Sequence, residues 1–210
     1  MAISYPVTPP DDLCRYVSFT MRLRRSIGVT RSPFTGAAQF YEWPFAVWEA
    51  DLQLQAGRRS VIAPLQAFIT SLRGMRGTFL MGPMQARIPR GTTNQSGVTA
   101  NGSASAGAQA IAVTGMGAGK TLLRGDFIQV GSDDAARLHM VVEDATANGS
   151  GQATLSIEPA LRAGVSGGAS VVVLAPKGAW RLTDNALGFT FGLANISDPV
   201  TIPCVENLTV

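Results

Sequence analysis

The stretch Val47-Trp48-Glu49-Ala50-Asp51-Leu52-Gln53-Leu54 alternates apolar and polar side chains with a period of two. Such alternation is typical of a β-strand with one buried face, because successive side chains of a strand point to opposite sides. The buried face would carry Trp48, Ala50, Leu52 and Leu54. The residues before it, from 15 onward, also favour β structure and contain a turn at Ser32–Gly36, so further strands are expected there.

After this strand the period changes. From Gly57 onward the apolar residues recur at spacings of three and four, at Val61, Ile62, Leu65, Phe68, Ile69 and Leu72. This pattern predicts one helix over about residues 60–73, with Ser60 as its N-cap and Gly74 as its stop. The apolar run Thr78–Met81 then predicts another strand.

The composition changes abruptly at Gly91–Gly107, which consists almost entirely of Gly, Ser, Thr, Asn and Ala and is typical of a linker or an exposed hairpin. Five short strand candidates follow, and together they predict a small β-barrel. They lie at residues 110–114, 126–130, 137–143, 153–158 and 170–174.

Aromatic strand character returns at Trp180-Arg181-Leu182-Thr183 and continues to Gly192. We therefore predict a mainly β fold with a discontinuous, β-sandwich-like outer domain made of residues 1–88 plus 178–210. The small β-barrel of residues 89–177 is inserted into one of its loops, where insertion of a domain is tolerated.

The overall composition limits the classes of protein that the chain can belong to. Its 210 residues include 23 Gly and 12 Pro, which favours many turns and excludes a helix bundle. No window approaches the roughly 20 apolar residues of a membrane span, and residues 1–10 lack the layout of a signal peptide. We expect a protein without stable membrane association that is made in the cytoplasm and kept there or in something assembled there.

Positive charge is concentrated in the first part of the chain. Residues 1–90 carry eleven basic and five acidic residues, although the net charge of the whole chain is only +3. Arg22, Arg24, Arg25 and Arg31 are predicted to form an assembly surface that meets carboxylates of a neighbouring subunit. The alternative is a solvated strand edge whose charges guard against aggregation. Nucleic-acid binding would call for a recognised module, and none is evident.

Aromatic residues are concentrated in the same region, and we expect them to pack in a core or a subunit interface. The alternative is that they stack against a sugar or a base. The group consists of Phe34, Phe40, Tyr41, Trp43, Phe45 and Trp48. Near the other end, residues 198–205 contain Pro199 and Pro203, too much proline for a central strand, so this segment is predicted to lie along a neighbour as an arm. The candidate assembly interface comprises Arg22, Arg24, Arg25, Arg31, Trp43, Trp48, Pro199 and Pro203.

One glycine-rich segment, Gly115–Thr121, ends in Gly-Lys-Thr like a phosphate-binding loop. That loop needs a first glycine at position 114, where this chain has Thr114, and a helix starting at Lys120. The following residues reach a glycine at position 125 after only four residues. We interpret the segment as a glycine-rich turn and predict no nucleotide cofactor.

The remaining reactive residues form no complete site. His139 is the only histidine and is predicted to lie on a polar strand face, while Gly164–Gly168 resembles a nucleophile elbow at Ser166 but is followed by β-branched residues rather than a helix. Cys14 and Cys204 are interpreted as free thiols, with a bridge between the chain ends as the alternative.

The paired carboxylates are interpreted as solvated turn residues, so a glycosidase lacks a cleft with two catalytic acids. These pairs are Asp11/Asp12, Asp133/Asp134 and Glu143/Asp144. We predict no catalytic residue, no metal and no cofactor, and a protein that is not an enzyme.

Several segments together resemble a known family. The similarity spans about residues 25–192, contains no catalytic motif and is to the distal tail proteins of long-tailed bacteriophages and prophages. The segments that carry it are Arg31–Pro44, Val47–Asp51, Ser71–Gly74, Gly77–Gly82, Leu123–Gly131, Ala153–Ile157 and Pro159–Arg162.

The resemblance implies a structural protein of the virion that forms a hexameric ring with a central channel. Such a ring joins the tail tube protein to the hub proteins of the tail tip, and DNA passes through it only as cargo. The inserted barrel would lie on the periphery, where it can carry tail fibres. The alternatives are another minor tail or tail-terminator protein and a carbohydrate-binding module of the tail tip.

Overall fold

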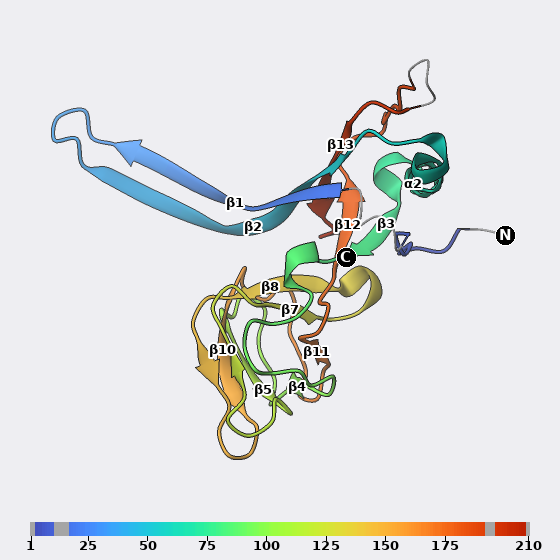
Figure 1. Ribbon diagram of the computed structural model, residues 1–210. Helices are drawn as coiled ribbons and strands as arrows, with labels where there is room; N and C mark the ends of the chain where they lie inside the picture. The colour runs from blue at the N-terminus through green and yellow to red at the C-terminus, as the bar shows by residue number, and fades with distance from the viewer. Residues whose placement is uncertain (1–2, 11–16, 192–195, 209–210) are drawn as a thin grey trace.

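The computed structural model describes residues 3–10, 17–191 and 196–208. It is mainly β, with 42% strand and 11% helical residues, which confirms the predicted class of a β-rich fold with a small barrel-like sheet. Figure 1 shows a sheet with a helix beside it, a long hairpin that extends away from this sheet, and the barrel-like part next to it.

The first sheet has five antiparallel strands, and segments from both ends of the chain contribute to it. Near the N-terminus, Val7 adds a parallel bridge to Phe79 and so covers part of the outer edge of the last strand. In spatial order the strands are β1 (Val17–Arg31), β2 (Ala38–Leu54), β13 (Val200–Glu206), β12 (Gly178–Leu182) and β3 (Thr78–Met81).

Helix α2 (Arg59–Ser71) packs against this sheet through its apolar face, formed by Ile62, Leu65, Phe68 and Ile69. It is the only α-helix in the described part of the chain. The predicted N-cap is wrong, because Arg58 has the extended cap conformation and Ser60 lies inside the helix. Its end is close to the predicted stop, since Arg73 and Gly74 both have positive φ, at 53° and 69°.

The second sheet curls into a nearly closed barrel. A bridge between Thr99 and Ser170 joins its two outermost strands. The barrel encloses its own apolar core, which includes Ile128, Leu155 and Ile157. In spatial order the strands are β11 (Val171–Val172), β7 (Phe127–Val130), β8 (Arg137–Val141), β10 (Ala153–Glu158), β5 (Ala110–Thr114) and β4 (Thr99–Ala100), with β6 (Thr121–Leu122) and β9 (Ala145–Thr146) forming a separate pair.

Short 3₁₀ turns connect several of these elements. They are η1 (Gly74–Arg76), η2 (Met84–Ala86) and η3 (Asp133–Ala135).

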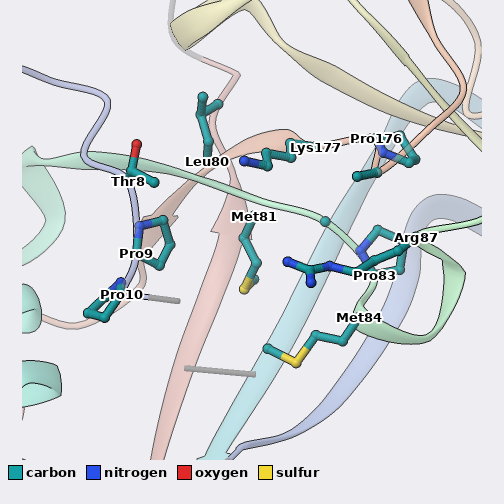
Figure 2. Close-up of a pocket in the computed structure, with 12 residues that line it drawn as sticks. Thr8, Pro9, Pro10, Leu80, Met81, Pro83, Met84, Arg87, Pro176 and Lys177 are labelled. Atoms are coloured by element: carbon teal, nitrogen blue, oxygen red, sulfur yellow. The ribbon is translucent and has the colours of Figure 1, made fainter. Parts of the chain in front are cut away.

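The two segments by which the chain enters and leaves the barrel lie side by side. Gly178 pairs with Met81, and the amide of Ala175 donates to the carbonyl of Arg87 at 2.6 Å. Figure 2 shows the small pocket at this crossing, of about 70 Å³, which has room for a few water molecules rather than an organic ligand. The strands of residues 126–174 share no sheet with those of residues 39–54, which supports the predicted insertion, although the domain boundaries stay a prediction.

The barrel and the first sheet meet at a buried junction. The indole N–H of Trp48 donates to the carbonyl of Leu138 at 2.9 Å, and the Trp48 ring packs against Phe127 with centroids 5.8 Å apart. Beside them, Arg162 of the barrel donates to the carbonyl of Ala46 and to Glu206 of β13. These contacts fix the barrel against the end of the sheet.

The end of the chain contradicts one prediction. Residues 200–206 form the central strand β13 between β2 and β12, not an arm on a neighbour. Proline is tolerated here because the carbonyl of Pro203 faces Thr183, whose amide donates to it at 3.1 Å just after β12 ends. The N–H that Pro203 lacks would point to the same side, away from β2, so the pairing with β2 is preserved.

The β1–β2 hairpin is much longer than the sheet that supports it. Strand β13 pairs with β2 only from Leu54 to Glu49, whereas β1 and β2 pair with each other as far as Arg31 and Ala38. The register shifts by two residues after the pair Arg25–Ala46, where β2 contains a bulge. We call residues 26–45, beyond this pair, the arm; it extends away from both sheets in Figure 1.

Candidate assembly interface

Many of the exposed apolar side chains of the molecule lie on the arm. Six of the twelve exposed large apolar side chains in the described part of the chain lie on it. Contiguous apolar surface of this kind marks interaction sites on soluble proteins. The six are Ile27 (49% exposed), Val29 (50%), Phe34 (95%), Phe40 (70%), Tyr41 (57%) and Trp43 (55%).

Both faces of the arm carry part of this surface. Val29 lies directly opposite Phe40, which places both side chains on one face, whereas Tyr41 lies opposite Gly28 on the other. The Trp43 ring lies over Gly28, because a Cβ added there would be 2.9 Å from two atoms of the ring. A two-stranded ribbon has no core of its own, so these side chains become covered only when another surface meets them.

The tip of the arm is a tight, ordered turn. The hydroxyl of Ser32 accepts hydrogen bonds from the amides of Phe34 and Thr35, each at 3.3 Å. Gly36, with φ of 71°, donates its amide to the carbonyl of Ser32 at 3.0 Å. This turn presents Phe34 to solvent at the far end of the arm.

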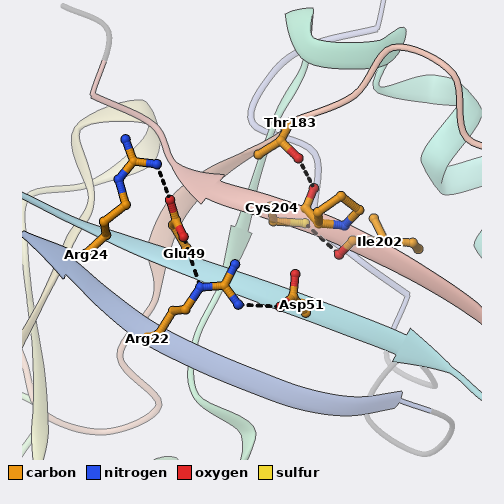
Figure 3. A network of polar contacts seen from close by, with 8 residues as sticks. Arg22, Arg24, Glu49, Asp51, Thr183, Ile202 and Cys204 are labelled. Atoms are coloured by element: carbon orange, nitrogen blue, oxygen red, sulfur yellow. Dashed lines mark hydrogen bonds and ion pairs between the residues drawn. The ribbon is translucent and has the colours of Figure 1, made fainter.

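The predicted arginines lie along β1, but their carboxylate partners are in the same chain. Arg22 donates to Glu49 at 3.0 Å and to Asp51 at 2.6 Å, and Arg24 donates to Glu49 at 2.8 Å, as Figure 3 shows. These pairs join β1 to β2; the arginine side chains are exposed, whereas those of Glu49 and Asp51 are partly buried. The prediction that Arg22 and Arg24 pair with carboxylates of a neighbouring subunit is therefore wrong, because their ion pairs are cross-strand contacts within the hairpin.

Arg25 and Arg31 occupy different positions. Arg25 bridges two parts of the molecule, because it pairs with Glu42 on β2 and with Glu158 on β10, both at 2.8 Å. Arg31 is exposed beside the tip, opposite Ala38. Of the predicted arginines, Arg31 is therefore the one that lies within the arm.

The other predicted interface residues separate into two groups. Trp43 is on the arm, and Pro199 is exposed just before β13. Trp48 is only 4% exposed, so it is not available to a second subunit, and Pro203 belongs to the central strand β13 rather than to an arm. Trp48 is buried because the barrel covers this end of β2, a contact that alternation within one strand does not reveal.

The glycine-rich turn is not a phosphate cradle. Gly115, Gly117 and Gly119 all have positive φ, but two of the amides that such a loop would offer to a phosphate, those of Gly119 and Lys120, are used within the chain. The amide of Gly119 donates to the carbonyl of Ala147, and the amide of Lys120 donates to the carbonyl of Gly117. The interpretation as a turn agrees with this geometry.

His139 differs from its prediction, because it is 1% exposed rather than on a polar face. Its Nδ1 lies 2.6 Å from the carbonyl of Pro159, so this nitrogen carries the proton and donates. Burial, together with the charges of Arg162 and Arg137, lowers the pKa of His139 to about 4, although the hydrogen bond to Pro159 opposes this shift. Ser166 lies in an exposed turn of the chain, so the two residues do not form the pair that a hydrolase needs.

Two further acidic pairs lie in turns, as predicted. Asp144 binds the guanidinium and the amide of Arg124, whose hydrogen bonds lower the pKa of this carboxyl. Glu143 accepts from the hydroxyl of Ser156, and Asp134 from that of Thr78. Among the described residues no three His, Cys, Asp or Glu side chains are grouped to hold a metal ion.

Of the two cysteines, the structure describes Cys204. Cys204 is a free, buried thiol whose pKa is raised by burial. Cys14 lies outside the described residues, as does the pair Asp11/Asp12.

One buried ionic contact was missed by sequence reasoning. Glu206, 3% exposed, accepts from the amide of Trp48 at 3.3 Å and from Arg162 at 3.2 Å. Burial raises the pKa of Glu206, although Arg162 and Arg137 oppose this effect. The three residues come from separate segments of the chain, so no local pattern could have predicted the contact.

Comparison with protein-family models and with curated proteins found no match. No helix in the described part of the chain is long and apolar enough to cross a membrane.

Proposed function

We propose that this chain is a structural subunit of a long-tailed bacteriophage or prophage tail, and specifically a distal tail protein. It assembles with copies of itself into a six-fold ring that joins the tail tube protein to the hub proteins of the tail tip. The ring leaves a channel for DNA, and the peripheral barrel is available to tail fibres. Its place of action is the virion.

The observation that carries this proposal is the arm. It places exposed aromatic and aliphatic side chains on both faces of a ribbon that extends beyond the sheet. A ring built head to tail repeats one contact between two different surfaces of each subunit. An extended arm supplies one of them, because it can reach across the boundary to the next subunit. The resemblance of residues 31–44, most of the arm, to the distal tail family points the same way.

The test is to remove the arm without disturbing the sheet. Arg25 and Ala46 are paired, so replacing residues 26–45 by Asn-Gly closes the hairpin with a two-residue turn. We expect the full chain to give six-fold rings with a central hole in electron micrographs and a hexamer mass by light scattering. The shortened chain should remain folded and monomeric.

The matched control is Thr30→Ala, which changes a polar side chain on the same strand of the arm and should leave the rings intact. A full chain that stays monomeric at high concentration and beside its purified tail partners would contradict the proposal. Rings formed equally well by the shortened chain would show that the arm is not the contact.

A further inference from the structure

A pocket lies where the root of the arm meets the barrel. Its volume is about 450 Å³, within the range of roughly 300–1,000 Å³ that is common for small-molecule sites. Such sites form preferentially where two structural units meet. The hairpin contributes Arg25, Glu42 and Trp43 to its lining, and the barrel contributes Gln109, Glu158 and Arg162.

The polar groups of this pocket are already held in place. Arg25 pairs with Glu42 and with Glu158, both at 2.8 Å, so one guanidinium fixes carboxylates from both sides of the pocket. The amide of Gln109 donates to the other oxygen of Glu158 at 3.1 Å. A ligand would meet a preorganised set of acceptors and donors, which reduces the entropy lost on binding.

The charges of the lining balance each other. The lining contains two guanidinium groups, of Arg25 and Arg162, and two carboxylates, of Glu42 and Glu158. This balance favours neither an anion such as phosphate nor a cation. It suits a neutral ligand with many hydroxyl groups, which can donate to the carboxylates and accept from the guanidinium groups.

Trp43 supplies the apolar part of the site. Its side chain is 55% exposed, whereas Trp48 and Trp180 are 4% and 0% exposed. A flat aromatic ring beside fixed polar groups matches a sugar ring, which has an apolar C–H face and a rim of hydroxyl groups. We infer that this pocket binds a neutral saccharide, with Trp43 against the sugar face and Glu42, Glu158 and Gln109 on its hydroxyl groups. The inference does not rest on the ring, but Glu42 and Trp43 belong to both the arm and this pocket, so a ring contact that covered them would compete with the sugar.

The exposure of the tryptophans provides a direct measurement. Because Trp43 is the only exposed residue among the chain's three tryptophans, a sugar that covers it should change the intrinsic fluorescence. We would titrate the full chain with maltohexaose, cellohexaose and chitohexaose, and with inorganic phosphate and a polygalacturonate fragment as charged probes. At least one neutral oligosaccharide is expected to bind and the charged probes are not, with affinities confirmed by calorimetry.

The variants separate the pocket from the rest of the arm. Trp43→Ala and Gln109→Ala should each weaken binding about tenfold, the size of one aromatic or polar contact, whereas Phe34→Ala at the tip should leave it unchanged. Circular dichroism and thermal unfolding establish that each variant is folded. The inference is overturned if no neutral oligosaccharide binds with a Kd below about 10 mM, or if the affinity survives Trp43→Ala. Saturable binding of the charged probes or of the chain's own arm at this pocket would overturn it as well.

Discussion

At the scale of single residues, the most consequential side chains are those at the junction of barrel and sheet. Arg162 and Glu206 form an ion pair in which the Glu206 side chain is only 2% exposed. Removing one partner of a buried pair leaves an uncompensated charge, whereas replacing both partners by neutral groups is far better tolerated. The pair therefore couples the position of the barrel to the stability of the sheet.

We predict that Arg162→Ala lowers the free energy of unfolding by about 3 kcal/mol, the usual cost of breaking a buried pair. The double variant Arg162→Met with Glu206→Gln should recover most of this loss, because Glu206 no longer brings a charge into the junction. Urea denaturation of the three proteins at pH 7 measures both effects. Equal stability of the single variant and the wild type would mean that the pair contributes nothing.

His139, on strand β8 of the barrel, makes the stability of the fold depend on pH. Its pKa is about 4 in the folded chain and about 6.5 when unfolded, so between these values the unfolded state binds the proton first. Stability is then fully present above pH 6.5 and is lost as the pH falls toward 4, by up to about 3 kcal/mol. Glu206 acts in the opposite sense, because its raised pKa lets the folded state take up a proton before the unfolded state does.

The variant His139→Asn isolates this contribution. The asparagine amide can still donate near Pro159, but it does not titrate. Urea denaturation at pH 7, 6 and 5 should show the wild type losing stability more steeply than the variant. Parallel pH profiles would exclude His139 as the source.

At the scale of elements, the sequence predicts strands and the helix better than their extent and neighbours. The period-two pattern of Val47–Leu54 and the period of helix α2 are local, and both elements form where they are expected. From residue 15 onward the sequence predicts only that further strands form, whereas the structure has one continuous strand β1 that runs through Arg22, Arg24 and Arg25. Cross-strand carboxylates on β2 pair with these arginines and let β1 continue to Arg31.

The positions of Pro203 and Trp48 also depend on neighbours that are distant along the chain. The proline at position 203 disfavours a central strand in general, but its missing N–H falls where β12 has ended. Trp48 is part of the predicted buried face, yet its partners Phe127 and Leu138 lie in the barrel. In each case the deciding neighbour is distant along the chain, so periodicity and composition do not contain it.

At the scale of the whole molecule, the two cores are not equivalent. The barrel core consists entirely of residues from the predicted insertion, whereas the core of the first sheet includes Phe127 and Leu138 from the barrel. The barrel also supplies Arg162 to Glu206 of the sheet. The sheet thus depends on the barrel more than the barrel depends on the sheet.

This asymmetry predicts different fates for the two parts when they are separated. Residues 87–177 should fold alone, because their apolar core is complete and Asp126 fixes the start of the segment through the amides of Arg90 and Gly91. The remaining chain, with Arg87 joined to Ala175 by Asn-Gly, should lose at least about 3 kcal/mol of stability through the uncovered Trp48 and the unpaired Glu206. Calorimetry of both pieces measures whether the barrel fragment unfolds cooperatively and how much stability the shortened chain has lost. Glu206→Gln in the shortened chain should restore part of that lost stability. A barrel fragment without a cooperative transition, or a shortened chain as stable as the whole, would mean that the two cores depend on each other in some other way.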